Sequence, residues 1–283
     1  MVKVSAIQMQ MSEDKAANVA KAEMMVREAA QGGAQIILLP ELFEGYYFCK
    51  DMDEKYFSWA TPLEGNALVA RFSALAKELK VVILISYFEK SDEGCFNSLV
   101  VADADGSVMD NYRKTHIPDG PGYEEKFYFK AGNTGFKVYD TAYAKIGVGI
   151  CWDQWFCETA RALTLMGAEI IFYPTAIGSE PEIHLDSKEH WQRVQMGHAA
   201  TNTVPVVVAN RIGEERGETC TLNFYGSSFI TDYTGAKIAE ASRDKEEILF
   251  ADFDIVENQK QRHYWGLIRD RQPSAYAEVC KQH

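Results

Sequence analysis

The chain has 283 residues, of which 47% are hydrophobic and 25% are charged, and these values exclude a largely disordered protein. Its formal net charge of −12 at pH 7 disfavours nucleic acid and anionic membrane surfaces as partners. No apolar run approaches the roughly 18 to 20 residues that cross a bilayer. Residues 1–9 alternate like a first strand and lack the apolar core and cleavage site of a signal peptide, so we expect a cytoplasmic protein.

Hydrophobic periodicity predicts strands and helices that alternate, then a hairpin, then alternation again. The expected strands are 1–9, 34–39, 81–88, 145–150, 168–174, 204–210, 226–231 and 248–253, and the expected helices are 13–31, 66–79, 186–202 and one that begins at Asp153. Asp105-Gly106 is the turn signal of a hairpin between 97–103 and 107–113. Residues 117–122 are loop by composition, and a short helix is expected after Asp254.

No linker or low-complexity tract divides the chain, so we expect one domain over residues 1–283, with the last ~25 residues as a C-terminal tail. The predicted fold class is α/β. A two-sheet sandwich fits, because helices lie between many strands while the hairpin makes part of the sheet antiparallel. Periodicity does not choose between this sandwich and a mixed open sheet.

The six cysteines lie apart, at positions 49, 95, 151, 157, 220 and 280, and form no C-x-x-C pair of the metal-binding type. In a cytoplasmic chain this spacing predicts reduced thiols and no disulfide framework. The cysteines are therefore candidates for core packing or for chemistry.

Cys151 ends the β-branched and glycine-rich run 145–150 and precedes a helical pattern. A nucleophile on a sharp turn between a strand and a helix is held away from its own backbone and exposed at the carboxyl edge of the sheet. The G-x-S-x-G pattern of the α/β-hydrolases, which use this geometry, is absent. The alternative is that Cys151 is a small apolar residue that closes a core strand.

Two other strand ends carry a charged residue. Glu41 follows the apolar run 36–40, and Lys114 follows 111–113 just before the loop rich in Pro and Gly. Each alone has the simple interpretation of a solvated surface residue. Together with Cys151 they form a workable acyl-transfer site, in which Glu41 would take the thiol proton and later activate water. Lys114 and the backbone N–H of Trp152 would stabilise the oxyanion.

Three segments resemble the signature segments of the nitrilase superfamily of carbon–nitrogen hydrolases, in that family's order: Leu-Leu-Pro-Glu at 38–41, Tyr-Arg-Lys-Thr-His at 112–116 and Gly-Ile-Cys-Trp-Asp at 149–153. The resemblance covers nearly the whole chain. It implies a four-layer αββα sandwich, a catalytic triad of Glu41, Lys114 and Cys151, no metal or organic cofactor, and a homodimer or higher homo-oligomer. It also implies a second glutamate that orients the site; Glu125 matches that position, and the adjacent Glu124 is the alternative.

Further segments resemble the N-carbamoylputrescine amidohydrolase branch of that superfamily, namely 43–48, 116–123, 125–129, 174–181, 190–191 and 197–199. This resemblance implies an enzyme that hydrolyses N-carbamoylputrescine to putrescine, CO2 and ammonia through a cysteine-linked carbamoyl enzyme. It also implies a place in polyamine biosynthesis from agmatine. The partner would be a small cationic ureido substrate.

The ammonium group of such a substrate needs a negative partner when it leaves water, so we expect a carboxylate at the far end of the pocket. Glu180, in the loop after the strand 168–174, is the first choice. Asp119, in the loop after Lys114, is the second. Asp153 also belongs to a segment expected around the pocket.

Four aromatic residues belong to segments expected beside this pocket: Tyr46, Tyr47, Phe48 and Trp152. Their rings would line the methylene chain of the substrate and attract its ammonium through cation–π contacts. Tyr47 and Trp152 are the candidates for substrate binding from this group.

Three alternatives stay open. An ω-amidase or a β-ureidopropionase would keep the fold but bind a substrate that carries a carboxylate, which needs an Arg or Lys in the pocket. Papain-like catalysis would use one of the six histidines, although no C-G-[SA]-C-[WY] segment is present, and His116 and His198 are expected to pack or form hydrogen bonds. A catalytically silent scaffold would have no need of three reactive groups.

Overall fold

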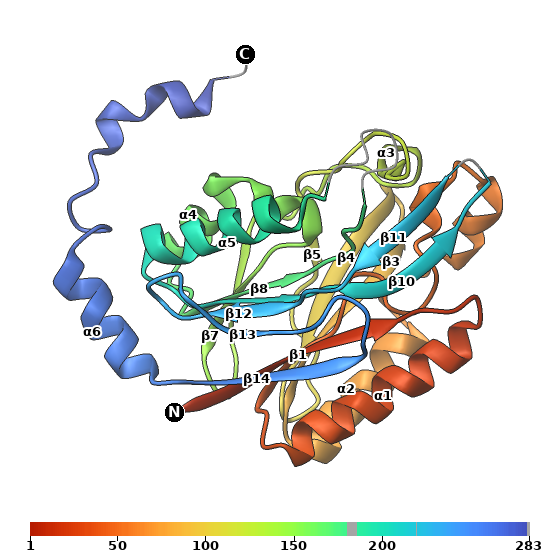
Figure 1. Cartoon of the computed structure of the whole chain (residues 1–283), viewed down its shortest axis with the longest axis horizontal. Coiled ribbons are helices and arrows are strands. Elements are labelled where there is room, and N and C mark those ends of the chain that lie inside the picture. The colour runs from red at the N-terminus through yellow and green to blue at the C-terminus, as the bar shows by residue number, and fades with distance from the viewer. Residues whose placement is uncertain (180–185, 219, 282–283) are drawn as a thin grey trace.

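Two mixed β-sheets form the centre of the computed structural model, which describes residues 1–179, 186–218 and 220–281 (Figure 1). The first sheet has eight strands, in the order β11 (Thr221–Tyr225), β10 (Arg211–Arg216), β1 (Val2–Gln10), β2 (Ile36–Leu38), β3 (Val82–Ser91), β4 (Gly94–Ala102) and β5 (Tyr112–Arg113), with β14 (Glu247–Phe253) paired to β1. The second has six strands, in the order β13 (Lys237–Glu240), β12 (Phe229–Thr231), β9 (Val206–Ala209), β8 (Ile170–Pro174), β7 (Lys145–Val148) and β6 (Lys137–Asp140). The chain crosses from the second sheet to the first at residue 210, between β9 and β10.

Helices cover the outer face of each sheet (Figure 1). α1 (Lys15–Gln31) and α2 (Ala67–Leu79) pack on the first sheet, and α4 (Cys157–Leu165) and α5 (Lys188–Asn202) pack on the second. The inner faces of the two sheets share one apolar core. The predicted four-layer αββα sandwich is confirmed.

β2 shows why the central strands are continuous apolar runs. Ile36 and Leu38 point into the core between the sheets, whereas Ile37 points outward against α1 and α2. Successive side chains of a strand face opposite sides, and protein covers both sides of this strand. All three residues are fully buried, so each position needs an apolar side chain.

The first two helices begin where a side chain can cap them. Asp14 Oδ1 accepts a hydrogen bond from the Ala17 N–H at 3.1 Å, and Asn66 Oδ1 accepts one from the Val69 N–H at 3.0 Å. Each cap satisfies a backbone donor that has no partner inside the helix. The predicted helices over 13–31 and 66–79 are confirmed to within two residues.

Hydrophobic periodicity does not predict β6, β10, β11 and β13, and the helix predicted from Asp153 begins later in the structure. A 3₁₀ turn (Cys151–Trp155) follows β7, and α4 starts only at Cys157. The hairpin is confirmed between β4 and β5, which pair antiparallel with Ser98 opposite Arg113, although β5 is limited to two residues. β10, β11 and β13 were missed because exposed polar residues interrupt their buried ones, which leaves no apolar run to recognise.

The segment after β14 contains α6 (Ile255–Trp265) and two 3₁₀ turns, and it extends along the side of the molecule that carries α4 (Figure 1). Arg262 fastens it to the body, because its guanidinium donates to the Thr203 carbonyl at 3.1 Å and to the Ala168 carbonyl at 3.0 Å. No helix in the described ranges is long and apolar enough to cross a membrane. All six cysteines are free thiols, as predicted.

Candidate active site

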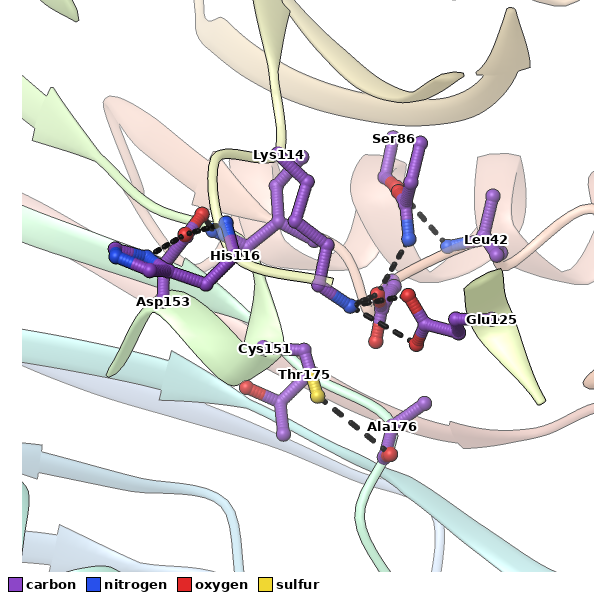
Figure 2. Close-up of polar contacts among 12 residues, drawn as sticks. Leu42, Ser86, Lys114, His116, Glu125, Cys151, Asp153, Thr175 and Ala176 are labelled. Carbon is purple, nitrogen blue, oxygen red and sulfur yellow. Dashed lines mark hydrogen bonds and ion pairs between the residues drawn. The ribbon is translucent and has the colours of Figure 1, made fainter. Parts of the chain in front are cut away.

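The expected site residues follow strands that end at one edge of the sandwich. Glu41 follows β2 and Lys114 follows β5 in the first sheet, whereas Cys151 follows β7 in the second. β2 and β5 run in the same direction, because β3 is parallel to β2 and β4 is antiparallel to both of its neighbours. Figure 2 shows Cys151, which follows a strand of the second sheet, across from the side chains of Lys114 and Glu125.

Lys114 is the centre of a buried charge cluster. Its Nζ lies 2.8 Å from Glu41 Oε1, and 2.9 and 2.7 Å from the two carboxylate oxygens of Glu125 (Figure 2). The three side chains are completely buried. Burial lowers the pKa of Lys114, but attraction to Glu125 and Glu41 outweighs it and raises the pKa well above its usual value, so the ammonium persists.

Glu41 has one oxygen that is occupied and one that is free. Oε1 accepts hydrogen bonds from Lys114 and from Asn97 Nδ2, the latter at 2.7 Å. Oε2 is buried, and among the described residues it has no hydrogen-bond partner. A buried polar atom without a partner is uncommon in folded proteins. This oxygen is therefore available to accept a proton.

Glu125 is the first residue of the short helix α3 (Glu125–Tyr128), and Tyr47 forms a hydrogen bond with its carboxylate. The Tyr47 hydroxyl donates to Glu125 Oε1 at 2.6 Å. Burial and repulsion from Glu41 raise the pKa of Glu125 to about 6, although Lys114 and Tyr47 oppose the shift. Burial and Glu125 also raise the pKa of Tyr47, which keeps the phenol protonated as a donor. Glu124 is only partly buried, and the structure brings Glu125, not Glu124, to Lys114.

Cys151 lies on a strained turn. Its φ of 42° is in the left-handed region, which is unfavourable for a residue with a Cβ. The thiol donates to the Ala176 carbonyl at 3.6 Å. Burial and the charge of Glu41 raise the pKa of the thiol well above its usual value, and Lys114 opposes this shift. Cys151 is only 6% exposed, so the expectation of an exposed cysteine is wrong: the turn aims the thiol inward, against the buried charges.

Asp153 holds this turn in place. Its carboxylate accepts hydrogen bonds from the backbone N–H groups of Ile150 and His116, both at 2.9 Å, and from the Tyr112 hydroxyl at 2.7 Å. The His116 ring contacts the same carboxylate through Nδ1 at 2.7 Å (Figure 2). The other side of the contact is packing, since the ring stacks on Phe156. The side chain of Asp153 is fully buried by these contacts. Asp153, which the sequence places in a segment around the pocket, therefore has a structural role in the turn.

A cavity of about 440 Å³ opens onto Cys151. Trp152, Trp155, Tyr123, Ile177, Asp119 and His190 contribute side chains to its lining. Trp152 is 38% exposed. The Asp119 side chain is half exposed, and its Oδ2 lies 3.7 Å from Lys126 Nζ. The cavity is thus mainly apolar and aromatic, with one carboxylate on it among the described residues.

Tyr47 does not line this cavity in the described structure, because it is completely buried and its hydroxyl is bound to Glu125. The interpretation of Tyr47 as a wall for the methylene chain is therefore corrected to a support for Glu125. Glu180 lies outside the described residues.

Sequence reasoning missed the contacts of Asn97 with Glu41 and of the Ala176 carbonyl with Cys151. Asn97 is fully buried inside β4, and a polar residue at the start of an apolar strand is the signal that could have identified it. The role of a backbone carbonyl such as that of Ala176 leaves no signal in the residue type.

A model of the carbon–nitrogen hydrolase family matches residues 3–263 of the chain. The chain is 54% identical to an N-carbamoylputrescine amidase of Arabidopsis thaliana, over 97% of this chain and 94% of the relative. It is 52% identical to a citrullinase of Francisella tularensis, over 100% of this chain and 99% of the relative. Among solved structures, a carbon–nitrogen hydrolase from Helicobacter pylori G27 matches with a TM-score of 0.92 and 34% identity, over 100% of this chain and 99% of that one.

Proposed function

The chain belongs to the carbon–nitrogen hydrolase family, and from this premise we propose that it hydrolyses N-carbamoylputrescine to putrescine, CO2 and ammonia. One observation carries the proposal: a cysteine lines a cavity and faces a buried lysine that is bound to two glutamates. The relatives named as N-carbamoylputrescine amidases and as a citrullinase both support a ureido substrate. The reaction would supply a diamine to polyamine synthesis.

In the proposed first step, Cys151 Sγ attacks the ureido carbon while Glu41 takes the thiol proton. The raised pKa of the thiol makes a base necessary, and Glu41 Oε2 is free to act as one. Negative charge develops on the carbonyl oxygen, where the positive charge of Lys114 and the backbone N–H of Trp152 stabilise it. The C–N bond to putrescine then breaks, and Glu41 returns the proton to the departing amine.

The remaining carbamoyl thioester is hydrolysed by water in the second step. Glu41 removes a proton from the water as its oxygen attacks the carbonyl carbon, and the C–S bond breaks. Cys151 regains its proton from Glu41. The released carbamic acid decomposes to ammonia and CO2. Glu125 contacts Lys114 and so holds both the charge and the position of the ammonium throughout.

The pKa of Glu125 predicts an acid limb in the activity. Below pH of about 6 the carboxylate binds a proton, loses its charge opposite Lys114 and no longer holds the ammonium against Glu41. We therefore expect kcat/KM to fall as the pH drops through about 6 and to reach a plateau above it. Glu125→Gln should be slow at every pH and lack this limb; a limb near 6 that persists unchanged in the variant contradicts the assignment.

The cavity favours an ammonium over a carboxylate at its far end. Asp119 lines it, and its described lining contains no Arg or Lys. In the sequence, residues 180–185 lie between the lining residues Ile177 and Ser187 and outside the described ranges; they include Glu180 and no Arg or Lys. A substrate carboxylate would lose its water there without gaining a positive partner, whereas an ammonium would gain a carboxylate as its partner. We propose Asp119 and Glu180 as its partners, with Trp152 beside the methylene chain.

A substrate panel tests this proposal. Ammonia release should be fastest with N-carbamoylputrescine, slower with citrulline, whose carboxylate needs a partner, and slowest with 3-ureidopropionate, which has no ammonium. Asp119→Asn and Glu180→Gln should raise KM for N-carbamoylputrescine more than they lower kcat. A wild-type preference for 3-ureidopropionate would refute the ammonium pocket.

Two further expectations stay predictions. A homodimer or higher homo-oligomer is supported by exposed apolar side chains of α4 and of the C-terminal segment that line one groove, namely Leu165, Leu267 and Val279. Solvent-exposed apolar side chains that gather in this way are typical of an interface. The cytoplasmic location rests on the sequence alone.

A further inference from the structure

Arg211 and Glu215 form an ion pair on β10 that is remote in sequence from every residue of the candidate site. Arg211 Nη1 lies 2.7 Å from Glu215 Oε1, and both side chains are completely buried. Removing two charges from water costs several kcal/mol per ion, and a well-packed apolar pair of similar volume is often as stable or more stable. Stability alone therefore gives no reason for this pair.

The guanidinium of Arg211 donates hydrogen bonds to three backbone carbonyls in the segment that follows β2. Nη2 donates to the Glu41 carbonyl at 2.7 Å and to the Leu42 carbonyl at 3.2 Å, and Nη1 donates to the Gly45 carbonyl at 3.4 Å. Leu42 has a φ of 48°, so the turn that carries Glu41 is held in an unfavourable conformation. A strained backbone persists only where its surroundings fix it. Arg211 supplies that fixation through its planar set of donors.

Glu215 and Arg211 also fix Tyr47, the residue that supports Glu125. Glu215 Oε2 accepts a hydrogen bond from the Tyr47 N–H at 2.6 Å. The guanidinium carbon of Arg211 lies 5.6 Å from the centre of the Tyr47 ring, within the range of a cation–π contact. The hydroxyl at the far end of the same ring donates to Glu125. The ion pair thus contacts the supports of both carboxylates that bind Lys114.

We propose that Arg211 and Glu215 are positioning residues for the reaction, which hold Glu41 directly through its backbone and Glu125 through Tyr47. The inference rests on the proposed function, because Glu41 is the base in that mechanism. A small displacement is sufficient to matter, since misplacing a reacting group by about 1 Å can lower a rate by about 10²-fold. The pair acts on the rate of the chemical step and leaves the substrate cavity unchanged, because neither residue lines it.

The test replaces the pair with apolar residues of similar size, in Arg211→Met/Glu215→Met. The double variant leaves neither charge of the pair without its partner. It does remove the acceptor of the Tyr47 N–H and the donor to three carbonyls, so its Tm should fall, as that of the control variant below should. Its kcat should fall by about 10²-fold while KM changes less than about threefold, because positioning is lost and the cavity is kept. Arg211→Lys keeps the charge but not the fork of donors, so its kcat should fall between those of the wild type and the double variant.

Arg262→Met is the matched control. Arg262 also donates to two backbone carbonyls, but it does so on the C-terminal segment, so its loss should lower the Tm and leave kcat unchanged. A double variant with the kcat of the wild type would overturn the inference. So would losses of kcat that follow Tm across all the variants, Arg262→Met included.

A readout that needs no turnover separates this inference from the proposed function. Crystal structures of the wild type and the double variant should show the 41–47 segment displaced in the variant and the 2.8 Å contact between Glu41 and Lys114 lost. An unchanged segment in the variant overturns the inference, whatever the substrate proves to be. If the wild type acts on another amide or urea and not on N-carbamoylputrescine, the proposed function fails while the same kinetic comparison proceeds with that substrate.

Discussion

Cys151→Ser is expected to bind N-carbamoylputrescine and to lose nearly all ammonia release, by on the order of 10⁴-fold or more, as when other catalytic nucleophiles are removed. A hydroxyl fits the same place but ionises far less readily than a thiol. Cys49 is a second thiol near the buried charges, but it is completely buried and does not line the cavity. Ammonia release under saturating substrate measures the loss. Circular dichroism and substrate binding should match the wild type.

Chemical labelling provides the control for this variant. Excess iodoacetamide should inactivate the wild type through Cys151, and bound substrate should slow the inactivation, because the thiol lines the cavity. Cys157 and Cys280 are exposed, so their modification should leave activity intact. Peptide mapping that links inactivation to Cys49 or Cys157, with Cys151 unmodified, would remove Cys151 from the mechanism.

Glu41→Gln should have the second-largest effect. The amide keeps the size of the side chain and its contact with Asn97 or Lys114 but cannot take the thiol proton, so kcat should fall by roughly 10²-fold or more. KM should change little, because Glu41 does not line the cavity. Steady-state kinetics on a variant shown to be folded measure both constants.

Glu44→Gln is the matched control for this prediction. Glu44 lies three positions along the same segment, but its carboxylate pairs with Lys15 at 3.1 Å on the surface. Exposed ion pairs contribute little, so its kcat should stay within about twofold of the wild type. Equal losses in the two variants, or a folded Glu41→Gln enzyme with normal kcat, would show that Glu41 is not the base.

The reactive residues of the site could be recognised in the sequence for a physical reason. Glu41 and Cys151 each follow an apolar strand that is covered by protein on both faces. A reactive side chain after such a strand differs clearly from the apolar residues before it. Lys114 had the weaker signal of a short strand, β5, and Glu125 was identified only by the family resemblance. The structure brings all four to one edge of the sandwich.

The supports of these residues could not be predicted, because their contacts join distant parts of the chain. Arg211 reaches the backbone of Glu41 across 170 positions, and Tyr47 reaches Glu125 across 78. From its residue type alone, Tyr47 was predicted to lie beside the substrate. In the structure its ring packs against Tyr123 and Phe224, and its hydroxyl donates to Glu125. β10, which carries Arg211, was missed altogether because polar residues interrupt it.

The products formed from N-carbamoylputrescine test the central claim most directly. Purified wild-type protein should release putrescine and ammonia in equal amounts as the substrate disappears, and Cys151→Ser, treated in the same way, should release neither. Equal release that depends on Cys151 is the result that the proposed mechanism predicts. Release of ammonia without putrescine, or no consumption of N-carbamoylputrescine by folded protein whose Cys151 still reacts with iodoacetamide, would contradict it.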